Sequence, residues 1–158
     1  MSSTNRQDAA ALKASIQPGT VVVASTGNGP FEQVMLDGRH TLIADEPASA
    51  GGHDTGPGPY ELLLMSLGSC TSMTVHMYAA RRKWPLEQVV VRLRHQKVYV
   101  QDCIDCEKPT SMLDRIDKEI ELIGALDAEQ RTKLIEIAGH CPVHRTLTAK
   151  IDIRTTVA

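Results

Sequence analysis

The feature that most constrains this chain is a long apolar stretch between two prolines, Pro59 and Pro85. Pro59 suits the first position of a helix, whereas Pro85 cannot continue one. Apolar side chains fall on every face of the helix between them, and they are Leu62, Leu63, Leu64, Met65, Leu67, Cys70, Met73, Val75 and Met77. A helix that is apolar all round is a buried helix. The stretch therefore predicts one long central helix, roughly 35 Å in length, around which the rest of the chain folds.

This stretch is not expected to cross a membrane, although it is long and apolar. Glu61, Gly68, His76 and several hydroxyl-bearing residues interrupt it, and polar groups of this kind are costly in hydrocarbon. The N-terminus has no apolar core of the kind found in secretory signal peptides. The formal net charge is −2, which gives no electrostatic reason to expect nucleic acid or an acidic membrane as a partner. We therefore expect a cytoplasmic globular protein.

The segments before the central helix alternate between short β patterns and turns. Asp8 is expected to cap a short helix that ends before Pro18-Gly19. Three strands should follow, the last two joined by the hairpin dipeptide Asp37-Gly38, and they cover residues 20–25, 31–36 and 39–44. A Gly- and Pro-rich loop then leads into the central helix. The first third of the chain thus predicts a three-stranded antiparallel meander.

The segments after Pro85 predict two long strands, a helix and a last strand. We expect one strand over 88–101, with a bulge near His95 where the apolar alternation shifts, and a strand over 115–123 although helical spacing also fits there. Asp127 and Gln130 form a capping-box pattern that opens a helix to Gly139. Clean alternation over 150–157 predicts a terminal strand. The order of elements indicates an α+β fold, with a tail and short helix over 1–18 and a single domain over 19–158.

Cysteines carry the chemistry that the sequence suggests. Four cysteines without a signal sequence indicate a reducing compartment, where thiols are catalytic, metal-binding or incidental. Cys70 lies in the middle of the central helix, where a buried cysteine acting as a small hydrophobe fits equally well. Cys141 lies at a helix-to-proline break between His140 and His144, a setting that can lower a thiol pKa. Two such thiols could reduce an O–O bond and pair as a disulfide, but their spacing leaves open whether they meet.

Cys103-x-x-Cys106 is a second cysteine constellation, in the loop between the two long strands. It could supply half of a zinc site, a redox pair or two incidental thiols. A structural zinc site needs about four ligands, and no second C-x-x-C exists in the chain. On these residues alone all three readings stay open, with two incidental thiols favoured over a metal site.

Two motifs together carry a resemblance to a known family. The run GPGPYELLLMSLGSCTSMTVHMYAARRKWPLE and the later run QRTKLIEIAGHCPVHRTL resemble the OsmC/Ohr family of osmotically inducible and organic-hydroperoxide-resistance proteins. The resemblance is nearest to the OsmC-like branch with a CPVHRTL motif, and it extends from about Val21 to the C-terminus. It implies an intertwined homodimer of α+β subunits, with antiparallel sheets around the long helix and an active site at each subunit interface.

The resemblance also implies an activity, namely thiol-dependent reduction of organic hydroperoxides. In that reading Cys70 is the peroxidatic cysteine and Cys141 the resolving one. Electrons come from a dithiol donor, often a protein-bound lipoyl group, and no haem, flavin or metal takes part. The alternative is a redox-sensing or metal- or ligand-binding protein of the same fold with little peroxidase activity.

The family's hydroperoxidases also hold the reactive thiolate with an Arg and a Glu. Glu61 is the local candidate for the Glu, but it precedes Cys70 by nine residues, about half a turn away from its face on an ideal helix. Gapless matching of the cysteine motif puts Tyr60 at the Glu position. The first strand turn lacks the Arg, and Arg39 is the substitute candidate. Arg39 and Glu61 thus complete the predicted catalytic set with Cys70 and Cys141.

Overall fold

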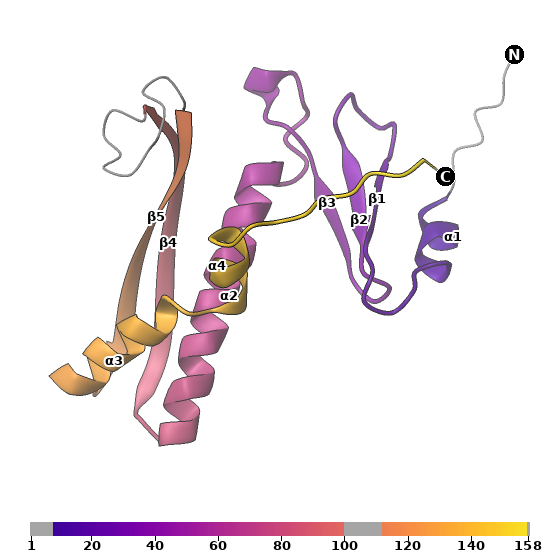
Figure 1. Cartoon of the computed structure of the whole chain (residues 1–158). Helices are drawn as coiled ribbons and strands as arrows, with labels where there is room; N and C mark the ends of the chain where they lie inside the picture. Colours follow the sequence, from indigo (N-terminus) through magenta and orange to yellow (C-terminus); the bar gives the residue numbers. More distant parts are fainter. Residues whose placement is uncertain (1–7, 100–111, 158) are drawn as a thin grey trace, which may run out of the picture. The chain divides into compact units, whose positions relative to one another are not determined.

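A computed structural model describes residues 8–99 and 112–157 (Figure 1). Cys103 and Cys106 lie outside the described residues, so the structure does not test the predictions made for them. The chain divides into two compact units, Met1–Leu62 and Leu63–Ala158. The single domain expected over 19–158 stays a prediction. No helix in the described ranges is both long and apolar enough to span a membrane.

The Met1–Leu62 unit is built on a three-stranded antiparallel sheet, as the sequence predicts. Helix α1 (Ala9–Ala14) begins after Asp8, whose carboxylate accepts a hydrogen bond from the backbone N–H of Ala10. The strands β1 (Val22–Ser25), β2 (Gln33–Leu36) and β3 (Thr41–Ala44) pair in the order β1-β2-β3. Gly38 has a φ of 89° in the turn between β2 and β3, a conformation that favours glycine.

Asp45 organises the loop that follows β3, which contains the short helix η1 (Ala48–Ala50). Its side chain is 2% exposed and accepts hydrogen bonds from the backbone N–H groups of Glu46, His53 and Thr55. Burial alone would raise the pKa of Asp45, but these donors and the Thr55 hydroxyl outweigh it and hold the pKa below its usual value. The ionised carboxylate is thus the form that the loop binds.

Glu32 is a second buried carboxylate of this unit, joined to Asp45 through Thr55. It accepts hydrogen bonds from the Thr26 hydroxyl at 2.6 Å, the Asn28 amide at 2.8 Å and the Thr55 hydroxyl at 3.0 Å. These hydrogen bonds, led by that from Thr26, lower the pKa of Glu32. The Thr55 hydroxyl also lies 3.2 Å from Asp45, so it has one proton for two carboxylates.

Acidification should therefore destabilise this unit. The folded state lowers both pKa values from ordinary values of 4.5 for Glu32 and 3.8 for Asp45. Lowered carboxyl pKa values contribute stability above the unfolded values, and this contribution is lost as the pH falls through the folded values. Thermal unfolding followed from about pH 7 to pH 3 should show the loss.

The matched variants are Asp45→Asn and Asp54→Asn. Asp45→Asn should be less stable than the wild type near neutral pH and should lose less stability on acidification. Asp54 lies exposed in the same loop, and Asp54→Asn should behave as the wild type. Full acid sensitivity in Asp45→Asn would contradict the assignment.

The Leu63–Ala158 unit combines most of the central helix with a long β-hairpin and two further helices. Helix α2 runs over Pro59–Arg82, as the two prolines predict, and begins in the other unit. The strands β4 (Leu86–Tyr99) and β5 (Met112–Gly124) pair antiparallel. Helix α3 (Ala128–Ala138) and helix α4 (Pro142–Leu147) follow. Figure 1 shows α2 running alongside the β4–β5 hairpin.

The core of this unit lies between α2, the hairpin and α3. Its buried side chains are Val75, Ala79, Val89, Leu122, Leu126, Leu134 and Ala138. Helix α2 buries every fourth residue, namely Leu67, Thr71, Val75 and Ala79, which is one face of a helix. A different face leaves Met65, Met73 and Met77 exposed at 57%, 64% and 58%. A single chain therefore covers only part of the apolar surface of α2.

Several expectations for the second half of the chain are confirmed. β5 is a strand, and the Asp127–Gln130 capping box opens α3. The expected bulge near His95 is wrong, because pairing is regular from Gln88 to Tyr99 and the register shift lies between Leu86 and Gln88. His95 Nε2 pairs with Asp114 Oδ1 at 2.8 Å, so a paired polar side chain interrupts the apolar pattern without shifting the register.

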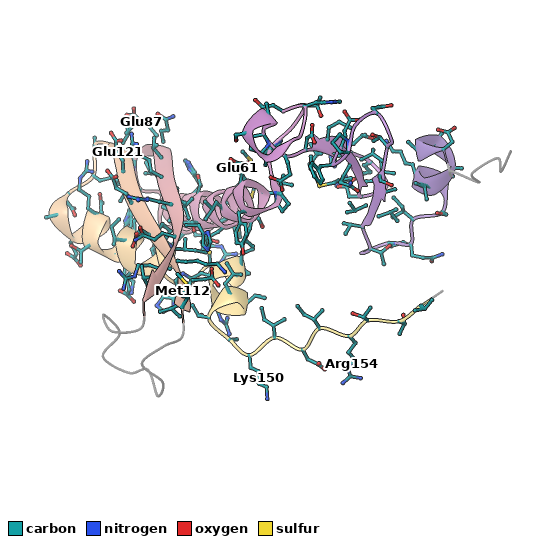
Figure 2. The ribbon with its side chains drawn as sticks, turned by 90° about the horizontal axis from the view of Figure 1, so that it is seen from above. Glu61, Glu87, Met112, Glu121, Lys150 and Arg154 are labelled. Atoms are coloured by element: carbon teal, nitrogen blue, oxygen red, sulfur yellow. The ribbon has the colours of Figure 1, made fainter. Side chains whose placement is uncertain are left out.

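The C-terminal segment also differs from expectation. Residues 150–157 form no strand among the described residues, and Ile153 is 83% exposed. Figure 2 shows Lys150 and Arg154 on an extended segment beyond α4. The alternation is real, but a strand needs a neighbouring strand to satisfy its backbone. Helix α4 is a further difference: the sequence predicts that Pro142 ends a helix, whereas in the structure it begins one.

Candidate functional site

The site forms where the start of α4 meets α2. Cys141 is the N-cap of α4, and Pro142 follows it at the first helical position. The Cys141 side chain is fully buried, and its Sγ accepts a hydrogen bond from the backbone N–H of His144 at 3.4 Å. An N-cap side chain satisfies donors that have no partner inside the helix. The same capping geometry directs a backbone donor at the sulfur.

Cys70 and Thr71 bring α2 to this sulfur. Thr71 is fully buried, and its Oγ1 lies 3.4 Å from Cys141 Sγ and 2.8 Å from the carbonyl of Leu67. Cys70 is only partly buried, and both cysteines are free thiols. Cys70 precedes Thr71 in α2, and its thiol lowers the pKa of Cys141. The structure thus brings together the two thiols that the sequence singled out.

A close approach of α2 to the hairpin positions this part of the helix. A Cβ at Gly68 would lie 2.9 Å from Cδ1 of Leu93 on β4, so the absence of a side chain lets the helix lie close to the strand. Leu93 pairs with Lys118 across the hairpin. The packing at Gly68 therefore sets Cys70 and Thr71 over the stretch of β5 that contains Lys118.

Lys118 is a site residue that the sequence reasoning missed. Its Nζ donates to the carbonyl of Ala138 at 2.8 Å and to Thr71 Oγ1 at 3.5 Å. A signal was present in the sequence, because Lys118 shares the period-two phase of Ile116, Ile120 and Leu122. A charge in an apolar row of a strand needs a partner in the core.

The surroundings of Cys141 favour its thiolate. Burial raises the pKa of the Cys141 thiol, but hydrogen bonds from Thr71 and from the His144 N–H, together with the neighbouring Cys70 thiol and the charge of Lys118, bring it below the usual value. Burial lowers the pKa of Lys118, and negative charge on Cys141 and Cys70 opposes that effect. The lysine and the thiols thus stabilise each other's charged forms.

A cavity of about 210 Å³ lies next to this site. Its walls combine apolar side chains with charged and polar ones, and they are Leu67, Asp114, Ile116, Lys118, His144, Leu147 and Thr148. Two of these residues also act on Cys141, His144 through its backbone N–H and Lys118 through its charge. The cavity therefore offers space for a small, partly apolar molecule beside the thiols.

Glu61 and Arg39 belong to the Met1–Leu62 unit. Glu61 Oε2 accepts a hydrogen bond from the Gly58 N–H at 2.5 Å, which satisfies a donor at the start of α2. Arg39 is exposed, and its N–H donates to Asp37 Oδ1 at 2.9 Å. A part for either residue in the thiol site stays a prediction. Among the described residues, no group of three or more His, Cys, Asp and Glu could hold a metal ion.

Thr71→Val should raise the pKa of Cys141 by about one unit, because a hydrogen bond to a charged group contributes about 1.5 kcal/mol or more. The ultraviolet absorbance of the thiolate, followed against pH, measures the change. Thr74→Val is the matched control, since the Thr74 hydroxyl donates to the carbonyl of Cys70 at 2.7 Å. An unchanged titration in Thr71→Val, or an equal change in the control, would contradict the assignment.

Comparison with known proteins identifies the family. Residues 52–156 match the model of OsmC-like proteins, a span that contains both Cys70 and Cys141. No curated protein matches the chain. An OsmC-like protein from Mycoplasma pneumoniae has a similar structure, with a TM-score of 0.63 and 15% identity over 81% of this chain and 85% of that chain.

Two hydroperoxide resistance proteins also share the fold. The organic hydroperoxide resistance protein OsmC from Legionella pneumophila has a TM-score of 0.58 and 19% identity, over 84% of this chain and 92% of that chain. OhrB of Bacillus subtilis, an organic hydroperoxide resistance protein, has a TM-score of 0.58 and 18% identity, over 84% and 93%. These likenesses establish the α+β fold, and the family model covers more than half of the sequence. The chain therefore belongs to the OsmC-like protein family.

Proposed function

We propose that the protein is a thiol-dependent peroxidase that reduces organic hydroperoxides through Cys70 and Cys141. The observation that carries the proposal is the pair of free thiols at one site, with the thiolate of Cys141 favoured by its surroundings, Cys70 among them. Thiolates are the form of cysteine that reacts with peroxides. A second thiol near the first suits the resolving step.

Exposure supports the assignment of the two roles. Cys70 is partly buried, whereas Cys141 is fully buried. A peroxide therefore reaches Cys70 more readily than Cys141, and Cys141 can react with Cys70 in the next step. We propose Cys70 as the peroxidatic cysteine and Cys141 as the resolving cysteine.

The proposed reaction closes a cycle in three steps. The sulfur of Cys70 attacks one peroxide oxygen, the O–O bond breaks, and the other oxygen leaves with a proton as the alcohol. Cys70 is then a sulfenic acid. The thiolate of Cys141 attacks the Cys70 sulfur, the S–O bond breaks and water leaves after protonation, giving a disulfide. A dithiol donor, such as a protein-bound lipoyl group, reduces the disulfide and is itself oxidised to a cyclic disulfide.

The cavity beside the site supports an organic substrate. Leu67, Ile116 and Leu147 give it apolar walls, which favour the carbon part of a hydroperoxide. The relatives from Legionella pneumophila and Bacillus subtilis are named organic hydroperoxide resistance proteins. We further propose a cytoplasmic location, because the thiols must return to the reduced state. Arg39 and Glu61 remain proposed contributors to holding the reactive thiolate.

We also propose that the protein acts as a homodimer. The exposed methionines of α2, Met65, Met73 and Met77, lie away from the buried face of the helix and form an apolar surface. Ile151 and Ile153 are exposed as well, at 50% and 83%, on a segment with a strand-like alternation. Surfaces of this kind are typical of subunit interfaces.

Peroxide consumption by the reduced protein with a dithiol donor tests the activity. Cys70→Ser should abolish turnover, because it removes the attacking sulfur. Cys141→Ser should stop the cycle after one equivalent of peroxide and leave a sulfenic acid on Cys70, detected by a sulfenic-acid reagent and mass spectrometry. The control is Cys103→Ser combined with Cys106→Ser, which should retain turnover. Equal rates in wild type and Cys70→Ser would refute the proposal.

Sedimentation analysis at micromolar concentration tests the dimer. Met73→Glu places a charge on the exposed apolar surface of α2 and should shift the protein to monomers, because burying an unpaired charge is costly. Ile135→Glu changes an exposed apolar residue of α3 and should leave the dimer intact. A wild type that is monomeric throughout would exclude the dimer.

A further inference from the structure

Lys118 is a charged side chain that forms no salt bridge with a carboxylate among the described residues. It lies in the apolar row of β5 and is partly buried. The adjacent residues Asp117 and Glu119 point to the opposite face of the strand. A buried ammonium group without an anion costs free energy.

The two thiols beside Lys118 can become anions, whereas Asp114, which lines the same cavity, pairs with His95. Its Nζ is held by the Ala138 carbonyl at 2.8 Å, at the end of α3 just before Cys141. It also lies 3.5 Å from Thr71 Oγ1, which in turn lies 3.4 Å from Cys141 Sγ. Negative charge on Cys141 or Cys70 favours the ammonium form of Lys118. The counter-charge of this lysine is therefore a thiolate.

We propose that Lys118 is a positioning residue that keeps the thiol pair at one negative charge, held mainly on Cys141, so that Cys141 serves as the base for Cys70. The inference deepens the proposed peroxidase function and rests on it for the catalytic role. Lys118 touches no reacting atom in this assignment, and it acts through Thr71 and through its charge.

Thr71 connects the lysine to the sulfur. Its hydroxyl oxygen accepts from Lys118, and its single proton has two acceptors, the Leu67 carbonyl and Cys141 Sγ. When Cys141 is a thiolate, the Thr71 hydroxyl donates its hydrogen bond to the sulfur and not to the Leu67 carbonyl, because hydrogen bonds to charged acceptors are the stronger ones. Lys118 makes that hydroxyl a better donor by binding its oxygen.

The proton balance then follows for the first step. Cys70 gives its proton to the thiolate of Cys141 as its sulfur attacks the peroxide. The O–O bond breaks, and the leaving alkoxide takes that proton from Cys141 to form the alcohol. Cys70 is now a sulfenic acid, and Cys141 is again a thiolate. It is then ready to attack the Cys70 sulfur, with hydroxide leaving and taking a proton from solvent.

The test is the titration of Cys141 in full-length variants, followed by thiolate absorbance. The contribution of Cys141 is taken as the difference between each variant and the same variant with Cys141→Ser. Lys118→Gln keeps a donor for the Ala138 carbonyl and removes the charge. We expect about tenfold less Cys141 thiolate near neutral pH, since a charge at this range shifts a pKa by about one unit or more. Lys118→Arg should restore most of the thiolate.

Lys97→Gln is the matched control, because Lys97 is exposed on the neighbouring strand β4, and it should titrate as the wild type. Other titratable groups beside Cys141 are Cys70 on α2 and His144 on α4, with His140 next to it in the chain. Their contribution should be the same in Lys118→Gln and Lys118→Arg. An unchanged Cys141 titration in Lys118→Gln, or an equal change in Lys118→Arg, overturns the proposal.

A second measurement, the redox equilibrium of the thiol pair, tests the proposal even if Lys118→Gln folds poorly, because it also uses Thr71→Val. The Cys70–Cys141 disulfide removes the anion that Lys118 needs, so Lys118 should favour the reduced pair. In equilibrium with a dithiol buffer, the Thr71→Val protein should shift toward the disulfide, and so should Lys118→Gln, by up to about tenfold. No shift in either variant overturns the proposal. Both measurements need no peroxide, so a wild type that shows the Lys118 effect but consumes no peroxide overturns the peroxidase function alone.

Discussion

The contact that the described site depends on is the packing of one face of α2 against the β4–β5 hairpin and α3. Val75 and Ala79 enter the core with Leu122 and Leu134, and Thr71 continues the same buried face toward the thiols. Because side chains four residues apart share a face of a helix, the apolar packing that stabilises the unit also fixes the direction of Thr71. The geometry of the site is thus a by-product of core packing rather than of a flexible loop.

The two cysteines differ in their burial and in their polar neighbours, a difference that the sequence alone does not reveal. Cys141 is fully buried, yet the hydroxyl of Thr71, a helix N–H and a lysine surround it. Cys70 keeps part of its surface exposed. Cys141 therefore lies where negative charge is favoured, and Cys70 lies where it is more accessible; in the proposed reaction this difference assigns proton transfer to Cys141 and contact with the peroxide to Cys70. The OsmC-like fold supplies the frame, while these particular neighbours define the chemistry.

Much of this could be predicted from the sequence. Prolines and glycines fixed the bounds of α2 and the first sheet, and the Asp127–Gln130 pattern located α3, because caps and turns depend on neighbouring residues alone. The pairing of Cys70 with Cys141 needed the family resemblance, since they lie far apart in the chain. The period-two phase of β5 indicates that Lys118 faces the core, but its contact with Thr71 depends on how α2 crosses β5, which no local pattern specifies. His95 misled the strand prediction because its partner, Asp114, comes from the other strand.

The single proton of the Thr71 hydroxyl has one more consequence. With Cys141 as a thiolate, that proton points at the sulfur; with the sulfur neutral or in a disulfide, it is free for the carbonyl of Leu67. The charge on the Cys141 sulfur therefore decides which hydrogen bond this hydroxyl makes within the helix that carries Cys70. Helix α2 thus responds to the ionisation of Cys141 as well as holding Cys70 in place.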